Sequence, residues 1–354
     1  MRPRLVDWTL LTLSLGAALG GFATWLMHDE QVVPFVALHV ALGTAALLPL
    51  AWKLRRVSPR LARARAWDWK TPISVLTAVA AIGALATGAV WTRFQVPTGY
   101  PNGMHLHIAF GIALIALAVV HMALRFKLPT RHDWRDRRSI LRWLGLAAFG
   151  AVAVPVQKAL DHHLNLPGAR RRFTGSRPAG DDTATAMPVT NWMFDHPAPV
   201  DTALWHLSVE GAVARTLKLS YTDLLALPQS TVRATLDCTG GWHSTQTWRG
   251  VRVGDLLDRA GVSPSARYIS FVSVTGYRWS LPISEAREAL LAVGYGDDLL
   301  THWHGAPLRL VAPGRRGFMW VKWVTQVRAL THPDLGQWLK IFTSGLESAN
   351  RFAA

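Results

Sequence analysis

The chain has 354 residues, of which 50% are hydrophobic and only 17% are charged, so it is long enough for two domains and too apolar to be disordered. Lys and Arg outnumber Asp and Glu by 38 to 22, but in the first half of the chain the excess lies at the ends of apolar runs, which is typical of membrane-protein loops. The single cysteine, Cys238, excludes an intramolecular disulfide framework and a zinc or iron–sulfur site made of cysteines alone.

Five apolar runs in the first 160 residues are long enough to cross about 30 Å of hydrocarbon as helices. Several carry Trp or Tyr near one end, as segments at a membrane interface do. The runs cover residues 8–27, 32–52, 73–91, 104–124 and 140–160. We therefore expect a transmembrane bundle of five helices within residues 1–161.

Basic residues in the connecting loops predict the orientation of this bundle. Residues 53–70 carry seven Lys or Arg and residues 125–142 carry seven more, whereas residues 28–31 and 93–103 carry only Arg93. The positive-inside rule then places the N-terminus in the cytoplasm and the chain after the fifth helix outside. The expected location is a bacterial inner membrane, in contact with lipid, with the C-terminal part in the periplasm.

An internal repeat places one histidine in each of two expected helices. Residues 38–43 (LHVALG) match residues 106–111 (LHIAFG), so His39 and His107 both lie near the outer end of a helix. Haem b needs two axial imidazoles at similar depth, and ionisable residues inside a membrane are functional by default. The alternative is that both histidines only form hydrogen bonds with the backbone or with each other.

His121 is a second candidate haem ligand. Its spacing from His107 resembles that of paired histidines on one helix in bacterial b-type cytochromes. Its counterpart in the repeat is Lys53, so one haem is expected rather than two. His121 is then either an alternative ligand or an interfacial residue.

Two further features precede the outer domain. Residues 137–142 (RRSILR) stand before the fifth apolar run and resemble an internal twin-arginine export signal, with ordinary flanking charge as the alternative. Residues 162–186 are rich in Pro, Gly, Thr and Asp, which predicts a linker.

Residues 187–354 change to short segments with strand and helix periodicity, which predicts an α+β domain. The expected strands are residues 204–210, 233–236, 268–274, 308–311 and 319–330, and the expected helices are residues 221–227, 253–260 and 284–291.

Cys238 stands where an expected strand meets the turn at Gly240 and Gly241, so its side chain can face a cleft. A thiolate at a strand end serves as a nucleophile or as a metal ligand. His243 is a nearby acid–base candidate, and the residues alone leave both roles open.

Several motifs between residues 187 and 330 occur in the same order as in the molybdopterin-binding domain of the sulfite oxidase family, which this part of the chain resembles. They are residues 188–195 (PVTNWMFD), 205–211 (WHLSVEG) with 223–228 (DLLALP), the Cys238 segment, 275–277 (TGY) with 280–282 (SLP), and 304–309 (HGAPLR) with 317–323 (GFMWVKW).

The resemblance implies that Cys238 binds molybdenum beside the dithiolene of one molybdopterin, and a soft thiolate suits that metal. It also implies that the pterin and its phosphate contact Asn191, Phe194, Asp195, Ser273, His304, Arg309, Gly317, Phe318, Met319 and Lys322. Arg309 suits the phosphate because a guanidinium is a bidentate donor.

Two departures from the family concern the substrate. Sulfite-oxidising members follow the cysteine with arginines, whereas Cys238 is followed by residues 239–243 (TGGWH), which resemble the periplasmic methionine sulfoxide reductases more. The residues after Lys322 are too few for the immunoglobulin-like dimerisation domain of sulfite oxidases, since such a domain needs about 100 residues.

Together these features predict a membrane-anchored molybdenum enzyme of electron transport. Quinol or another membrane donor would supply electrons through haem b, and the outer domain would reduce an S- or N-oxide by oxo transfer. One alternative is a haem-free anchor whose molybdopterin domain works with a soluble redox partner and oxidises its substrate. Another is a binding protein without metal. No nucleic-acid partner is expected.

Overall fold

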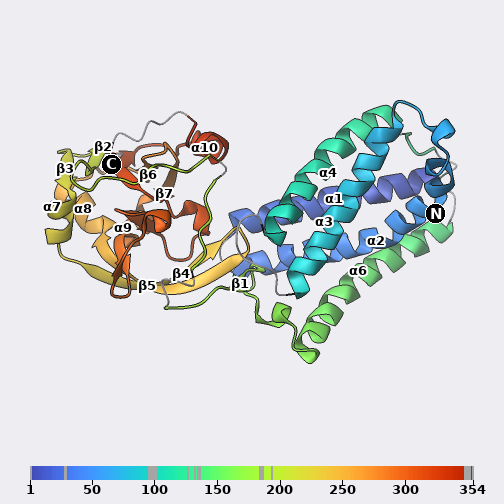
Figure 1. Ribbon diagram of the computed structural model, residues 1–354, viewed down its shortest axis with the longest axis horizontal. Coiled ribbons are helices and arrows are strands. Elements are labelled where there is room, and N and C mark those ends of the chain that lie inside the picture. Colours follow the sequence, from blue (N-terminus) through green and yellow to red (C-terminus); the bar gives the residue numbers. More distant parts are fainter. Residues whose placement is uncertain are drawn as a thin grey trace. The chain divides into compact units, whose positions relative to one another are not determined.

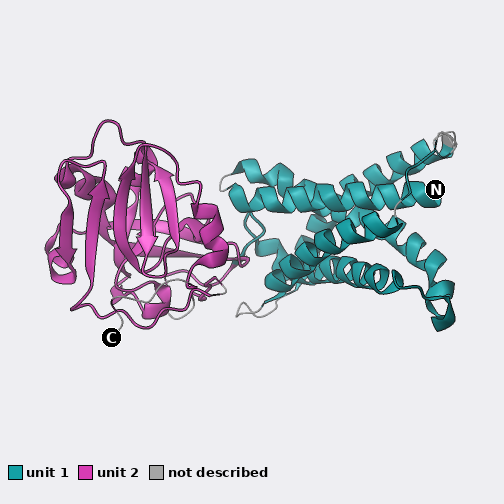
Figure 2. Cartoon of the chain, turned by 90° about the horizontal axis from the view of Figure 1, so that it is seen from above, with its two compact units in different colours: residues 1–177 teal, residues 178–354 magenta. Residues whose placement is uncertain are grey.

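The structure, a computed structural model, describes residues 2–27, 30–94, 102–125, 127–130, 133, 137–182, 187–192, 194–346 and 352. The chain divides into two units, Met1–Arg177 and Pro178–Ala354 (Figures 1 and 2). Parts of the expected loops 28–31, 93–103 and 125–142, and residues 183–186 of the expected linker, lie outside the described residues.

The first unit is built from long helices. They are α1 (Pro3–Leu26), α2 (Val33–Leu61), α3 (Thr71–Arg93), α4 (Gly103–Arg125) and α6 (Arg137–His163), with short 3-10 helices η1 (Glu30–Val32), η2 (Ala64–Ala66) and η3 (Pro167–Arg170) between or after them. Within the described residues, these five helices are long and apolar enough to cross a membrane. The structure therefore confirms the five apolar helices, and most of them run past the predicted apolar runs into charged ends.

The surface of this helical unit is apolar. Leu19, Ile112 and Val119 are each more than half exposed, although large aliphatic side chains of a water-soluble helix bundle face its interior. Exposed apolar surface of this kind requires a partner or a lipid environment.

Small residues let the helices approach closely, and they do so twice in the same way. A Cβ at Gly16 of α1 would lie 2.8 Å from Leu42 of α2, and one at Gly83 of α3 would lie 2.6 Å from Phe110 of α4. Close helix contact in membranes depends on such small residues. The pairs α1–α2 and α3–α4 therefore repeat one packing arrangement.

The second unit is an α+β fold with two sheets, which confirms the predicted fold class. In one sheet β4 (Ser230–Cys238), β5 (Trp242–Arg252), β8 (Leu290–Tyr295) and β10 (Arg309–Val311) are neighbours in that order, with β9 (Asp298–Leu299) beside β8. In the other the order is β3 (Leu217–Ser220), β2 (His206–Gly211), β11 (Val324–Leu330), β6 (Tyr268–Ser273) and β7 (Arg278–Pro282). β2 and β11 are parallel, and the other neighbouring strands of these two orders pair antiparallel.

Short helices complete this unit. They are α7 (Tyr221–Ala226), α8 (Val253–Ala260), α9 (Ile283–Glu288) and α10 (Gln337–Thr343), with 3-10 helices η5 (His302–His304) and η6 (Gly317–Met319); the two-residue strand β1 (Arg177–Pro178) lies at the boundary of the units. The helix α7 begins with a capping box, in which Ser220 Oγ accepts from the Asp223 N–H and the Asp223 carboxylate accepts from the Ser220 N–H.

The prediction of one strand over residues 319–330 is wrong at its start. Gly317–Met319 forms η6, and Trp323 adopts a φ of 51°, so extended pairing begins only at Val324. The predicted helix over residues 284–291 is wrong at its end, because Leu290 already belongs to β8. β8 is buried on both faces, and such a strand has no polar alternation to distinguish it from a buried helix end.

Adjacent leucines of α7 test the packing of the second unit. Leu224 is fully buried and Leu225 is 39% exposed. We expect Leu224→Ala to lower the free energy of unfolding by about 2–5 kcal/mol because it leaves a cavity. The control Leu225→Ala should change it by no more than about 0.5 kcal/mol. Limited proteolysis of the second unit at increasing urea measures both, and equal effects would contradict the placement of α7.

Candidate functional site

Cys238 ends strand β4 at a tight hairpin. The strands β4 and β5 pair so that Cys238 lies opposite Trp242, and Gly241 closes the turn with a φ of 86°, where side chains are strained. The Gly240 N–H points at the sulfur, 3.3 Å from Sγ. The predicted strand end and glycine turn are thus both present, and they hold a thiol that is only 7% exposed.

The surroundings of Cys238 do not suit a free nucleophile. Burial raises the pKa of the Cys238 thiol, and the Gly240 N–H, the Thr190 hydroxyl, Arg316 and Lys322 oppose this only in part. His243 lies opposite Asp237 in the hairpin, and successive side chains of a strand point to opposite faces. His243 therefore lies on the other face from Cys238, which favours the second role left open by the sequence, that of a metal ligand.

Lys322 lies inside the site, and its ammonium group has three hydrogen-bond acceptors. Its Nζ donates to the carbonyl oxygens of Thr190 at 3.1 Å and Trp303 at 2.7 Å, and to Asn191 Oδ1 at 2.5 Å. Burial and the charge of Arg309 together lower the pKa of Lys322 to about 7, although Cys238 and Asp195 oppose the shift. The amine therefore ties the segment around Asn191 to the strand region after η6.

Arg309 begins β10 and is 3% exposed. Its Nη1 donates to the His304 carbonyl at 2.9 Å, and its guanidinium lies 5.4 Å from the centre of the Trp248 ring. Burial lowers the pKa of Arg309 to about 10. Its Nε is buried and has no hydrogen-bond acceptor among the described residues, so one donor of this cation is left for another group.

A buried ion pair that the sequence did not predict lies beside the thiol. Arg316 Nη1 is 2.7 Å from Asp237 Oδ1, and Arg316 Nε has no acceptor within the described part of the chain. The next residue, Gly317, starts η6, and a Cβ there would lie 3.0 Å from Cys238 Cα. No signal in the local sequence identifies Arg316, because its partner is 79 residues away.

The remaining candidates lie in two groups. Asp195 is buried, hydrogen-bonds to Thr275 and leaves Oδ1 without a partner among the described residues, and burial raises the pKa of Asp195. Ser273 contacts the same threonine, because its Oγ accepts from the Thr275 hydroxyl at 3.1 Å. The Tyr277 hydroxyl donates to the Phe318 carbonyl at 2.6 Å, so this loop also reaches η6.

Two predicted contacts have a different environment from the others. His304 uses both ring nitrogens within the protein, with Nδ1 2.8 Å from Thr301 Oγ1 and Nε2 3.0 Å from the Met187 carbonyl. A carbonyl only accepts, so Nε2 carries the proton, and burial lowers the pKa of His304 to about 4. The Phe194 side chain is 47% exposed, whereas Met319 is buried.

The site as a whole has unused capacity for an anion. The buried Arg309 and Arg316 and the half-buried Lys322 lie near the thiol, and each of the two arginines has an Nε without an acceptor among the described residues. Buried donors and charges of this kind are normally paired. The residues present therefore fit an anionic group with a soft metal at Cys238, as a molybdenum-bound pterin phosphate would be.

In the helical unit the structure brings His39 and His107 together. Their ring centroids are 5.7 Å apart with the planes at 87°. His39 Nδ1 lies 2.7 Å from the Ala17 carbonyl, and His107 Nδ1 lies 2.8 Å from the Ala84 carbonyl. Each carbonyl accepts from Nδ1–H, which leaves the lone pair on Nε2, the state in which histidines bind metal.

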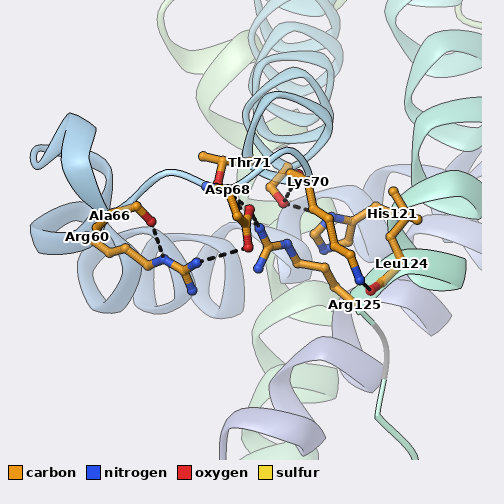
Figure 3. A network of polar contacts seen from close by, with 9 residues as sticks. Arg60, Ala66, Asp68, Lys70, Thr71, His121, Leu124 and Arg125 are labelled. Atoms are coloured by element: carbon orange, nitrogen blue, oxygen red, sulfur yellow. Dashed lines mark hydrogen bonds and ion pairs between the residues drawn. The ribbon is translucent and has the colours of Figure 1, made fainter.

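His121 lies apart from this pair. Its Nδ1 is 3.2 Å from Ser74 Oγ, in a polar network at the start of α3 where Lys70 Nζ donates to the Leu124 carbonyl at 3.0 Å and Arg125 pairs with Asp68 (Figure 3). Fourteen residues of helix separate it from His107, or about 21 Å. The structure therefore does not bring His121 to either of the other two histidines.

The internal repeat extends further than the histidine segments. Residues 16–21 (GAALGG) of α1 and 83–88 (GALATG) of α3 each supply the carbonyl that binds a histidine and, four residues later, a glycine against its ring. A Cβ at Gly88 would lie 2.9 Å from the His107 ring, and one at Gly21 would lie 3.1 Å from the His39 ring. This shared G-A-x-x-x-G pattern is the signal that the sequence analysis missed.

Comparison with known proteins gives one family model and several relatives. The model described as "oxidoreductase molybdopterin binding domain" matches residues 194–338. The uncharacterized oxidoreductase YuiH of Bacillus subtilis is 30% identical over 168 residues, which are 47% of this chain and 84% of that protein. The catalytic subunit MsrP of the protein-methionine-sulfoxide reductase of Gluconobacter oxydans is 28% identical over 246 residues, 61% of this chain and 76% of that one.

Among solved structures, the sulfane dehydrogenase SoxCD of Paracoccus pantotrophus is 26% identical, with a TM-score of 0.37. The match covers 38% of this chain and 40% of that one.

The lowered pKa of Lys322 predicts a pH dependence of the stability of the cofactor-free chain. Its pKa is about 7 when folded, against about 10.4 in an unfolded chain. Between these values the unfolded chain binds more protons, so the free energy of unfolding rises with pH. We expect Lys322→Met to remove this part of the rise, and Lys218→Met, at an exposed lysine of β3, to retain it. Urea unfolding between about pH 7 and pH 10 measures the slope, and equal slopes in wild type and Lys322→Met would refute the prediction.

Proposed function

Because this chain belongs to the molybdopterin-binding oxidoreductases, we propose that it is a membrane-anchored enzyme that reduces an S- or N-oxide with electrons taken from the membrane. The observation that carries the proposal is the buried thiol of Cys238 near two buried cations, Arg309 and Arg316, and the half-buried Lys322. When bound, molybdenum supplies the two-electron oxo-transfer chemistry, and the residues of the chain supply position and charge.

The residues proposed to contact the cofactor are assigned from their hydrogen bonds and burial. Cys238 is the thiolate ligand, and it must lose its proton to bind metal. Arg309 and Arg316 offer to anionic oxygens their Nε donors, which have no acceptor among the described residues. Lys322 holds Asn191 in place while it adds positive charge. Asp195 and the backbone of Gly317–Met319 are further cofactor contacts proposed from the family motifs. Ser273, His304 and Phe194 are proposed as contacts on the motifs alone.

The reductive direction is supported by the residues after the cysteine and by the relatives. The turn after Cys238 consists of small residues rather than arginines, so it offers little positive charge to a sulfite dianion. The relative from Gluconobacter oxydans is named as a methionine sulfoxide reductase subunit. A sulfoxide is neutral and needs no cationic cage, which makes a sulfoxide the favoured substrate class.

Membrane anchoring is supported by five long apolar helices and by exposed side chains such as Leu19 and Ile112. The basic loops 53–70 and 125–142 favour a cytoplasmic N-terminus and a periplasmic second unit in a bacterial inner membrane. Arg137 and Arg138 begin α6, as an internal twin-arginine signal for export of the second unit would require.

A haem b between His39 and His107 is the proposed entry point for electrons from quinol or another membrane donor. The adjacent rings, the matching Nδ1 hydrogen bonds and the glycines beside them support it. When bound, haem carries single electrons, and the helices hold the two imidazoles in one tautomer. A haem-free anchor served by a soluble partner is the alternative, and it predicts no haem spectrum.

Replacement of the thiol tests the catalytic site. A serine at position 238 is nearly isosteric, so we expect Cys238→Ser to keep the fold and much of the pterin. The hydroxyl is a harder ligand, so reduction of methionine sulfoxide by a reduced viologen dye should fall at least about a hundredfold, which corresponds to about 2.7 kcal/mol.

The control for this experiment is Thr235→Ser, which keeps a hydroxyl next to Thr245 in the same hairpin and should leave the rate unchanged. Molybdenum content is measured on each preparation. A rate near wild type in Cys238→Ser would refute the assignment of the metal ligand, and faster oxidation of sulfite than reduction of any oxide would refute the proposed direction.

Replacement of the histidines tests the haem site. We expect His39→Ala and His107→Ala each to remove the reduced b-type absorption band of purified membranes. His121→Ala is the matched control, since it lies in another polar network, and should keep the band. Loss of the band in His121→Ala alone would show that the pairing is wrong, and its absence in the wild type would favour the haem-free anchor.

A further inference from the structure

Two guanidiniums converge at the C-terminal end of α3. The Arg177 side chain donates to the Trp91 carbonyl at 3.2 Å, and the Arg171 side chain donates to the same oxygen. The Arg177 guanidinium also lies 4.3 Å from the centre of the Trp91 ring, and that of Arg171 lies 6.0 Å from it. Trp91 is 1% exposed, so the two cations meet around a buried aromatic ring.

Arg171 shares its carboxylate partner with a second arginine. The described carboxylate that faces Arg171 is Asp161, and Asp161 also pairs with Arg93 at 3.8 Å. Burial and the charge of Arg177 together lower the pKa of Arg171 to about 10, although Asp161 opposes both effects. Asp161 therefore serves both Arg93 and Arg171, while the charge of Arg177 acts against that of Arg171 in a half-buried place, where like charges are costly.

Two buried N–H donors of the cluster also lack an acceptor. Neither Arg171 Nε nor Trp91 Nε1 has a hydrogen-bond partner among the described residues. A buried donor without an acceptor costs about 1–3 kcal/mol, so the arrangement favours an anionic group with several acceptor oxygens. Arg171 is held in place for such a group, since its Nη1 donates to the Gly175 carbonyl at 2.8 Å.

The cluster lies on the same face of α3 as the histidine pair. Ala84, Gly88 and Trp91 are spaced i, i+4 and i+7, which places them on one side of a helix. Ala84 binds His107 Nδ1 and Gly88 lies against the His107 ring. Trp91 is the next residue of this face towards the end of α3, so a flat group bound between the histidines would have its edge near Trp91.

We infer that Arg171 and Arg177 form an anion site that binds the propionate carboxylates of the haem. This inference rests on the proposed haem site. The recognised chemistry is a pair of carboxylate oxygens, for which guanidiniums are the preferred donors. The phosphate of an anionic lipid has the same chemistry and is the other source that the experiment must separate.

The experiment compares two forms of one ligand. The purified full chain is stripped of haem in neutral detergent and titrated with protohaem or with protohaem dimethyl ester, whose propionates carry no charge. The wild type should bind protohaem at least about tenfold more tightly than the ester, the scale of one hydrogen bond to a charged group. This comparison needs no substitution, so it stands even where a variant fails to fold.

The variants Arg171→Gln and Arg177→Gln should each lose most of this preference while they bind the ester as the wild type does. Arg170→Gln is the matched control, because Arg170 belongs to the same basic run and is exposed, and it should keep the preference. A shift of the haem midpoint potential in Arg171→Gln, with the reduced band retained, would support the same conclusion.

Three results would overturn the inference. Equal loss of affinity for protohaem and its ester in the variants would make the arginines structural caps of α3. Unchanged protohaem binding, with phosphatidylglycerol stabilising the wild type but not Arg171→Gln, would identify a lipid phosphate as the ligand. A wild-type chain that binds neither form would refute the proposed haem site itself, a failure that is separate from the other two.

Discussion

The ion pair between Asp237 and Arg316 is the contact on which the candidate cofactor site depends. It joins two segments 79 residues apart, and each partner directly precedes a residue of the site, Cys238 in one case and Gly317 in the other. Both side chains are at most 9% exposed, and removal of one partner of such a pair costs about 3–5 kcal/mol. The pair therefore determines how closely the η6 backbone approaches the thiol. It also helps to position Lys322, which follows η6 in the chain.

The helical unit depends on a comparable constraint, which consists of hydrogen bonds to main-chain carbonyls instead of an ion pair. The carbonyls of Ala17 and Ala84 bind the Nδ1 atoms of His39 and His107. Because a main-chain carbonyl on a helix cannot rotate, it fixes both the tautomer and the ring orientation of its histidine. The same hydrogen bond occurs in α1–α2 and in α3–α4, so duplication of one helix pair generates two imidazoles whose ring centroids lie 5.7 Å apart.

Elements and site residues could be predicted where their signal lies in residues that are neighbours in the sequence. Apolar runs of about twenty residues are local, and they predicted the five long helices. The strand end at Cys238 and its glycine turn are local too. β8 was missed because it is buried on both faces and does not alternate, and Arg316 was missed because its role exists only through Asp237. His121 shows the reverse case, in which a suggestive spacing from His107 leads to a contact with Ser74.

Each of the two units contains buried positive charge, and the same physical argument applies to both. A cation removed from water is stable only when anions or acceptors replace its hydration. Arg309 and Arg316 in the second unit, and Arg171 in the first, each keep a buried Nε without an acceptor among the described residues. An arginine whose only role was to cap a helix or to pair with one carboxylate could leave its Nε–H in contact with solvent at no cost. The burial of Nε at these three positions is explained when a cofactor brings the missing anionic oxygens.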